Sequence, residues 1–245
     1  MRNGYFIYNG INSYDYDIAV SGEGTWHRPQ PDIKRIQVPG RNGDLIQLGN
    51  RYLNLDITYH CGIVENLRTN FESFNAALLR DTGYHRLEDS YNPEYYRMAV
   101  FEYSLDPDVN ERTLTGEFDI KFNCKPQLFL KSGENEQLIS NGGVINNPTK
   151  YTASPVIRFK LTNSTGGSIT INGRTITAQN AVTSDYIIID CEREDIYLAG
   201  NRQNMNNCFT LSTGEFFELL PGNNTISFTG IYQGIIYITP NWWTV

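Results

Sequence analysis

The residue types best suited to catalysis are scattered in this chain and form no recognisable motif. Its three histidines, His27, His60 and His85, have no second histidine or glutamate at the spacing of a metal site or a catalytic triad. Neither a G-x-S-x-G nucleophile elbow nor a P-loop occurs. The sequence therefore predicts no catalytic residue, no metal ligand and no cofactor-binding residue, and we expect a protein that is not an enzyme.

The strongest argument for an enzyme comes from two groups of carboxylates, because glycosidases place two acidic groups beside the bond they cleave. One group is Glu192, Glu194 and Asp195, and the other is Asp106 and Asp108. Both lie in expected turns among polar residues, where solvated charge is the simpler interpretation. A cell-wall glycosidase, or a carbohydrate-binding adhesin, remains the alternative function.

The four cysteines indicate packing rather than reactivity. No C-x-x-C pair occurs, which disfavours a zinc ribbon or a redox motif. Cys61, Cys124 and Cys191 each close a run in which apolar and polar residues alternate, so they fall on the apolar face of an expected strand. We predict reduced thiols in the protein core.

The elements that must position these residues are almost all strands. Period-2 alternation runs through 51–61, 98–103 and 115–124, and a tight hairpin is expected around Asn172-Gly173. A single helical stripe is formed by Val64, Leu67, Phe71, Phe74 and Leu78, with Gly83 as its expected end. The predicted fold is mainly β with one helix.

Composition and charge narrow the class of protein. The chain has 245 residues, 13% aromatic and 19% charged, with no apolar run near 18 residues, so disorder and a membrane span are disfavoured. Its net charge of −7 disfavours a protein that wraps nucleic acid. Residues 131–149 are poor in apolar side chains and are expected to link a domain at 1–130 to a β-sandwich at 150–245.

Several segments in order resemble a known family. They are Val38-Pro39-Gly40-Arg41-Asn42-Gly43-Asp44, then Pro93-Glu94-Tyr95-Tyr96-Arg97, then Cys124-Lys125-Pro126, and finally Thr239-Pro240-Asn241-Trp242-Trp243. Their order resembles the distal tail (Dit) proteins of long non-contractile-tailed phages and prophages of Gram-positive bacteria. The resemblance covers essentially the whole chain, with Asn241 at a position where family members often carry arginine.

The resemblance implies a structural hub protein of the virion tail tip, assembled in the bacterial cytoplasm. Residues 1–130 would form a homo-hexameric ring joining the tail tube to the host-adhesion device. Residues 150–245 would be a galectin-like β-sandwich that docks receptor-binding or baseplate proteins. DNA would pass through the lumen without specific binding, and no membrane partner is expected. The sugar-binding residue set of true galectins does not occur here. A generic jelly-roll virion protein is a further alternative.

Two short segments are the candidate interaction residues. Arg41, Asn42, Gly43 and Asp44 combine a tight-turn pair with flanking opposite charges, which suits a subunit or tube contact or an ordinary hairpin tip. Tyr95 and Tyr96 suit an interaction surface or plain packing at a sheet edge.

Overall fold

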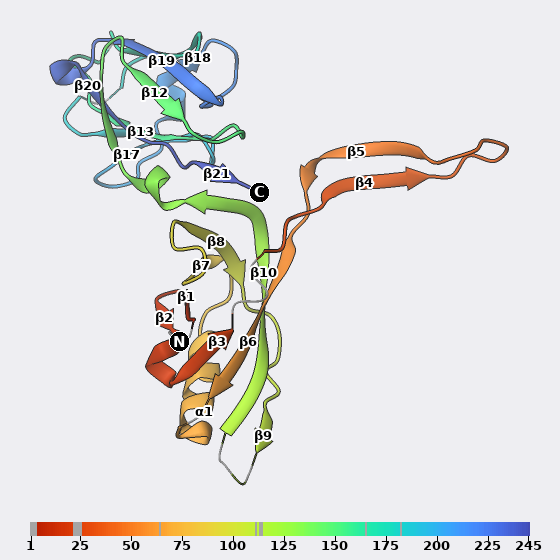
Figure 1. Ribbon diagram of the computed structural model, residues 1–245. Helices are drawn as coiled ribbons and strands as arrows, with labels where there is room; N and C mark the ends of the chain where they lie inside the picture. The colour runs from red at the N-terminus through yellow and green to blue at the C-terminus, as the bar shows by residue number, and fades with distance from the viewer. Residues whose placement is uncertain are drawn as a thin grey trace. The chain divides into compact units, whose positions relative to one another are not determined.

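The chain divides into two compact units, residues Met1–Leu128 with Val245, and residues Phe129–Thr244. This computed structural model (Figure 1) describes residues 4–21, 26–63, 65–110, 112, 115–164, 166–181 and 183–245. Strands dominate both units, and the described residues contain a single α-helix. The expected fold class, mainly β with one helix, is confirmed. In the described part of the chain no helix has the length and apolar character that a membrane span requires.

Unit 1 is built on one large antiparallel sheet with strand order β2-β1-β7-β8-β10-β6-β3, and β9 also pairs with β10. The β6 and β10 strands pair over nine residues, from Leu55 opposite Cys124 to Ile63 opposite Gly116. The strands are β1 Phe6–Tyr8, β2 Ile11–Asn12, β3 Ile18–Ser21, β6 Leu55–Ile63, β7 His85–Asp89, β8 Tyr95–Val100, β9 Asp108–Asn110 and β10 Thr115–Leu130.

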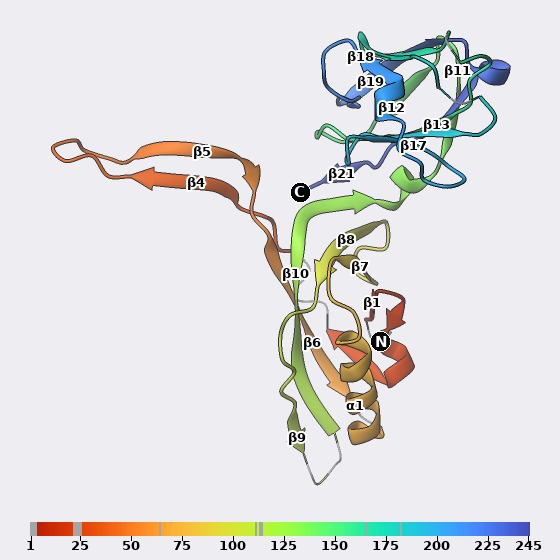
Figure 2. The ribbon, with the colours of Figure 1, turned by 180° about the vertical axis from the view of Figure 1, so that it is seen from behind.

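The helix α1, Leu67–Leu78, lies along this sheet beside β6 (Figures 1 and 2). Phe74 and Leu78 are fully buried, and Phe71 packs edge-on against Phe118 with ring centroids 5.3 Å apart. The predicted stripe is therefore core, apart from Val64, which lies outside the described residues. The helix ends at Leu78, five residues before Gly83, because Leu79 is its C-cap and keeps a right-handed conformation.

Unit 2 is a sandwich of two five-stranded antiparallel sheets, β11-β20-β13-β16-β17 and β12-β19-β14-β15-β18. Asn172 and Gly173 have φ angles of 50° and 86°, which is the left-handed pair that a two-residue hairpin needs, so the predicted hairpin is confirmed. The strands of the two sheets are β11 Gln137–Ser140, β12 Val144–Asn147, β13 Val156–Phe159, β14 Ser168–Ile171, β15 Arg174–Ala178, β16 Ile187–Asp190, β17 Asp195–Leu198, β18 Phe209–Leu211, β19 Gly222–Thr229 and β20 Ile235–Thr239. The last strand, β21 Trp243–Thr244, pairs with β10.

The segment 131–149, which the sequence assigns to a linker, carries strands of unit 2. After a short 3₁₀ turn at Lys131–Glu134, β11 adds to one sheet and β12 to the other. Each is a four-residue edge strand that places one apolar side chain in the core, Ile139 and Ile145 respectively. Because each strand buries a single apolar side chain, its other residues can be polar. The composition of residues 131–149 therefore resembles that of a linker.

The C-terminal tryptophans close unit 2. Trp242 is 3% exposed, and a Cβ on Gly133 would lie 2.4 Å from its backbone nitrogen, so only glycine fits there. Trp243 stacks on Tyr151 with centroids 4.6 Å apart. Asn241 adopts a φ of 57° and donates from Nδ2 to the Ser154 carbonyl at 3.1 Å, so an amide hydrogen bond occupies this position.

Candidate interaction surfaces

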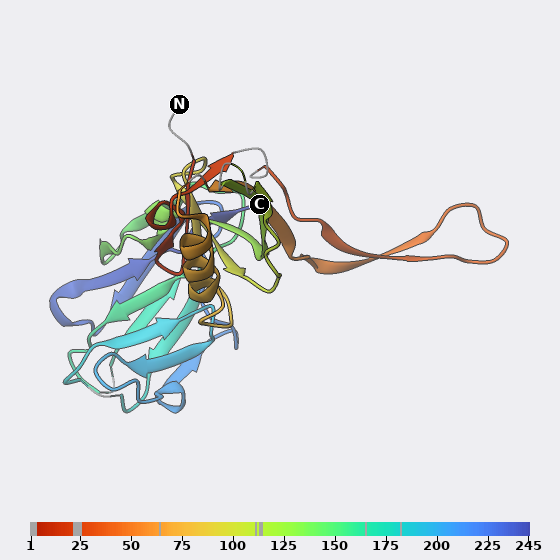
Figure 3. The same cartoon turned by 90° about the horizontal axis from the view of Figure 1, so that it is seen from below.

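The most conspicuous surface of unit 1 is a two-stranded arm that lies outside the large sheet. β4, Pro31–Ile36, and β5, Leu45–Tyr52, pair with each other and form a sheet of their own (Figure 3). Arg51 Nε donates to Asp32 Oδ2 at 2.7 Å and ties the two strands near the root of the arm. Nearly every residue of the arm is exposed or half-exposed.

The predicted interface residues occupy the tip of this arm. Gly40 and Gly43 have φ angles of 79° and 82°, which explains why two glycines stand in the turn between β4 and β5. Arg41 donates its backbone N–H to the Val38 carbonyl at 3.2 Å. The side chains of Arg41 through Asp44 are exposed. The tip is thus accessible, and its role in a contact stays a prediction.

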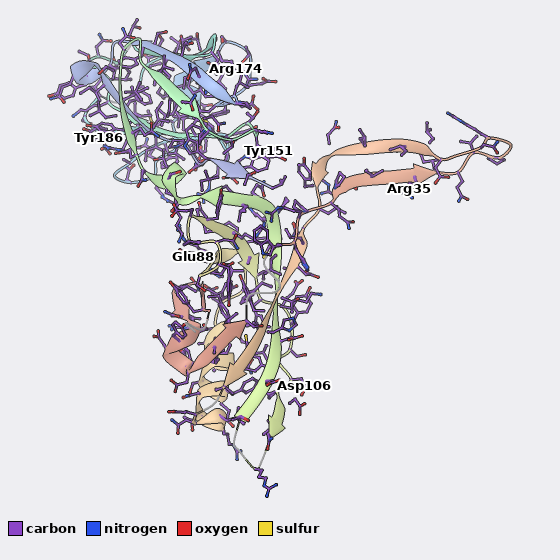
Figure 4. The ribbon with its side chains drawn as sticks, in the orientation of Figure 1. Arg35, Glu88, Asp106, Tyr151, Arg174 and Tyr186 are labelled. Carbon is purple, nitrogen blue, oxygen red and sulfur yellow. The ribbon has the colours of Figure 1, made fainter. Side chains whose placement is uncertain are left out.

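One face of the arm is mostly apolar, which sequence patterning did not single out, and the other face carries one apolar pair, Ile36 opposite Leu45. Ile33 stands opposite Leu48, and Arg35 stands opposite Ile46 on the same face (Figure 4 labels Arg35). Ile33, Ile46 and Leu48 are 41%, 55% and 62% exposed. Isolated two-stranded ribbons are at best marginally stable in water, and long unpaired strand edges invite pairing with another chain. The arm therefore has the character of a segment that another molecule covers.

Charge separates the arm from the rest of unit 1. Residues 26–53, which include the arm at 31–52 and the residues that flank it, contain five basic and two acidic residues, a formal charge of +3, and the arm itself has a formal charge of +2. The remainder of residues 1–128 contains eight basic and sixteen acidic residues, a formal charge of −8. A cationic arm on an acidic body is complementary to the body of another copy of the same chain.

A polar cluster lies at the root of the arm. Asp56 accepts hydrogen bonds from Asn123 and Tyr103 at 3.0 and 3.2 Å and pairs with Lys121 at 2.7 Å. Burial acts to raise the pKa of Asp56, but the bonds from Lys121, Asn123 and Tyr103 outweigh it and lower that pKa. Asp56 and Lys121 border an open cavity of about 640 Å³ together with His27. The carboxylate is held ionised and paired, which suits a structural role rather than acid–base catalysis.

Tyr95 and Tyr96 begin β8 and are half-buried, on a different element from the arm tip. The Arg86 guanidinium lies 4.0 Å from the centroid of the Tyr96 ring. Both tyrosines border a small cavity that also contains Arg97, whose buried Nη1 has no hydrogen-bond partner in the described structure. Packing within unit 1 accounts for much of the burial of Tyr95 and Tyr96. A role for the two tyrosines in binding another molecule stays a prediction.

Two of the carboxylates considered for a glycosidase border a cavity in unit 2 that an arginine also lines. Glu192 and Glu194 border a cavity of about 410 Å³ together with Glu215 and Glu218, which the sequence did not single out. Arg174 lines the same cavity, with Nη2 3.0 Å from Glu215 and 3.1 Å from Glu218. Asp195 instead accepts a hydrogen bond from Asn204. Within the described ranges, no group of three histidine, cysteine or acidic side chains is arranged to hold a metal ion.

The cysteines are all free thiols, as predicted. Cys61, Cys124 and Cys191 are buried, and burial raises the pKa of each to about 12. At pH 8 a thiol with such a pKa is ionised in about one molecule in ten thousand, so it is a poor nucleophile.

We expect at most one of the four thiols, the half-exposed Cys208, to react with Ellman's reagent in the native protein at pH 8 within minutes. The other three react only when unfolding exposes them and returns their pKa to the ordinary range. Full reaction of all four in guanidinium is the control. Rapid stoichiometric labelling of Cys61, Cys124 or Cys191 in the native protein would contradict this assignment.

Comparison with known proteins gives a consistent result. Residues 142–242 match the family model described as siphovirus-type tail component, C-terminal domain. A search of curated protein sequences finds no significant match. The whole chain is similar to the crystal structure of SPP1 Dit, described as a paradigm of the hub adsorption apparatus in phages that infect Gram-positive bacteria. The TM-score is 0.76 at 15% identity, covering 96% of this chain and 97% of that one.

Two further similar structures come from the phage P2 baseplate in its activated conformation. The form with Ca has a TM-score of 0.56 at 13% identity, covering 97% of this chain and 98% of the other. The form with Sr has a TM-score of 0.53 at 12% identity, with 97% of each chain covered. At these identities the similarity establishes a shared fold along nearly the entire chain.

Proposed function

We propose that this chain, a Dit-type tail hub protein by its fold and by the family match of its C-terminal residues, closes into a homo-hexameric ring at the tail tip and joins the tail tube to the host-adhesion device. The observation that carries the proposal is the arm of unit 1. It is extended, exposed, apolar on one face and opposite in charge to the body from which it projects.

A contact between the arm of one subunit and the acidic body of the next implies a head-to-tail arrangement. The arm and the acidic body are different surfaces of one subunit, so a contact between them is heterologous and repeats around a ring when the rotation closes. Six copies are what the resemblance to distal tail proteins implies. The arm tip at Arg41, Asn42, Gly43 and Asp44 would contact the neighbouring subunit or the tube.

The acidic body also suits the passage of DNA. A surface of net negative charge repels phosphate groups, so a lumen bordered by it would let DNA pass without specific binding. Unit 2 would present its sandwich to receptor-binding or baseplate proteins. In this proposal the protein has no catalytic role and resides in the virion tail, after assembly in the bacterial cytoplasm.

The test of the ring is a mass measurement of the purified chain, combined with negative-stain imaging. Six subunits of 28.0 kDa give 168 kDa and a six-fold ring. Because the arm and body attract each other through opposite charge, raising NaCl from 50 to 500 mM should raise the concentration for half-assembly by about tenfold. A chain that remains monomeric at every concentration and at low salt would overturn the proposal, and salt-insensitive assembly would contradict the electrostatic contact.

A further inference from the structure

The two outer faces of the sandwich in unit 2 differ sharply in chemistry. The outer face of β12-β19-β14-β15-β18 carries hydroxyl pairs, including Ser168 opposite Thr229 and Thr170 opposite Thr175. That is the ordinary composition of a solvated β-surface, with Val144, opposite Thr225 on the edge strand, as an exposed apolar residue.

The outer face of the other sheet carries a continuous aromatic and apolar row. Leu138 stands opposite Tyr237, Tyr237 opposite Arg158, Arg158 opposite Ile188, and Ile188 opposite Tyr197. One residue from each of the five strands contributes, so the row spans about 19 Å at the usual strand spacing. Leu138 is 56% exposed and the other four are half-exposed. We call these five residues the outer row.

The centre of the outer row is held rigid. Arg158 makes a two-pronged ion pair with Glu136, with N–O distances of 2.8 and 2.6 Å. Its guanidinium also lies 4.1 Å from the Tyr237 ring centroid and 4.7 Å from that of Tyr186, which Figure 4 labels. The bond to Glu136 raises the pKa of Arg158, so the charge is permanent. Rigid tyrosine and arginine side chains lose little entropy on binding, and they dominate the energetic centres of protein interfaces.

Two cations flank the outer row without counter-ions. Lys160 Nζ lies 5.5 Å from the Tyr232 ring centroid, and Arg202 lies 5.8 Å from that of Tyr197. Neither forms an ion pair within the described part of the chain, although residues 129–244 as a whole contain seven basic and nine acidic residues. Positive charge is therefore left without a counter-ion at the edges of this face, in a unit of net charge −2.

We infer that the outer row is the docking surface for a protein of the same tail whose contact surface has an apolar centre and carboxylates at its rim. The inference deepens the docking role proposed for unit 2 and rests on that proposed function. The apolar and aromatic row would meet the centre of the partner, and Lys160 and Arg202 would meet its carboxylates. A protein is favoured over a glycan because Arg158 already covers the Tyr237 and Tyr186 rings and because Leu138 and Ile188 offer no hydrogen bonds.

The experiment measures binding of the full-length chain to each tail-tip protein of the phage that encodes it, each purified separately, by biolayer interferometry. We expect one of them to bind, and Leu138→Asp and Lys160→Glu each to weaken that binding by at least 30-fold. Leu138 is exposed on an edge strand, so its substitution should leave the unfolding temperature unchanged. Lys150→Glu, an equal charge change in an exposed turn, and Thr177→Glu on the hydroxyl face are the matched controls and should stay within twofold.

Three outcomes would overturn the inference. They are binding of no tail-tip protein, binding that Leu138→Asp and Lys160→Glu leave intact, and binding of purified cell-wall polysaccharide that these variants abolish. The mass of the ring is measured on the same variants. Variants that form a normal ring but lose docking support the outer row as the docking surface. If the chain never forms a ring but still docks through the outer row, the proposed ring is contradicted and the docking surface is not.

Discussion

Replacing Asn224 by aspartate is expected to destabilise unit 2 by about 4 kcal/mol at pH 7, enough to unfold a marginal domain. Asn224 is fully buried, and its amide joins three segments. Its Oδ1 accepts from the Leu220 N–H at 2.7 Å and from Asn172 Nδ2 at 2.6 Å. Its Nδ2 faces the carbonyls of Leu220, Gly222 and Ile145 at 2.9 to 3.3 Å. A carboxylate would turn those three attractive contacts into repulsive ones.

The pH dependence of Asn224→Asp has a definite sign. Burial against carbonyl oxygens raises the pKa of the introduced carboxyl above its unfolded value, so the defect is smallest at low pH and deepens as the pH rises above about 4. Asn223→Asp is the matched control, because Asn223 is exposed and uses its oxygen to accept from Asn146 Nδ2. That control should change the free energy of unfolding by less than about 0.5 kcal/mol. Urea unfolding followed by tryptophan fluorescence measures both, and equal stability of the two variants would contradict the role of Asn224.

Leu48→Asp is expected to abolish ring assembly while leaving the subunit folded. Leu48 is 62% exposed in the subunit and lies on the apolar face of the arm, so a carboxylate there costs little until a neighbour covers it. Burying an uncompensated charge at the contact costs about 2 kcal/mol or more per interface, a factor of about thirty in each association constant. Because a ring closes through several such interfaces, the loss accumulates and monomers should predominate by mass photometry.

Gln47→Asp is the control for this variant. Gln47 is the preceding residue on the same strand, is exposed, and points to the opposite face of the arm. The Gln47→Asp variant adds the same charge to β5, and we expect it to retain most of the ring assembly. Arg41→Ala at the arm tip should weaken assembly less than Leu48→Asp, with no change in thermal unfolding. A ring that tolerates Leu48→Asp as well as Gln47→Asp would mean that the apolar face of the arm is not the contact.

The sequence by itself determined the features that depend on local periodicity. Alternating residues predicted the strand through Cys61 and the strand ending at Cys124, and the pairing of β6 with β10 buries both thiols. The 3.6-residue stripe at Leu67 to Leu78 predicted a helix with one buried face, because that periodicity places its apolar residues on one side. Asn172-Gly173 predicted a hairpin because only a few residue pairs adopt two left-handed conformations in succession.

Tertiary structure decided what those elements do. Leu45, Ile46 and Leu48 are as compatible with a core strand as with an exposed one, and only the pairing of β5 with β4 alone reveals an uncovered arm. The apparent linker at 131–149 became two edge strands, since one buried apolar side chain suffices for each. Asn224 gave no signal in the sequence, because its five partners come from three separate segments. The outer row likewise joins five strands between residues 138 and 237, and periodicity cannot report which distant strands become neighbours.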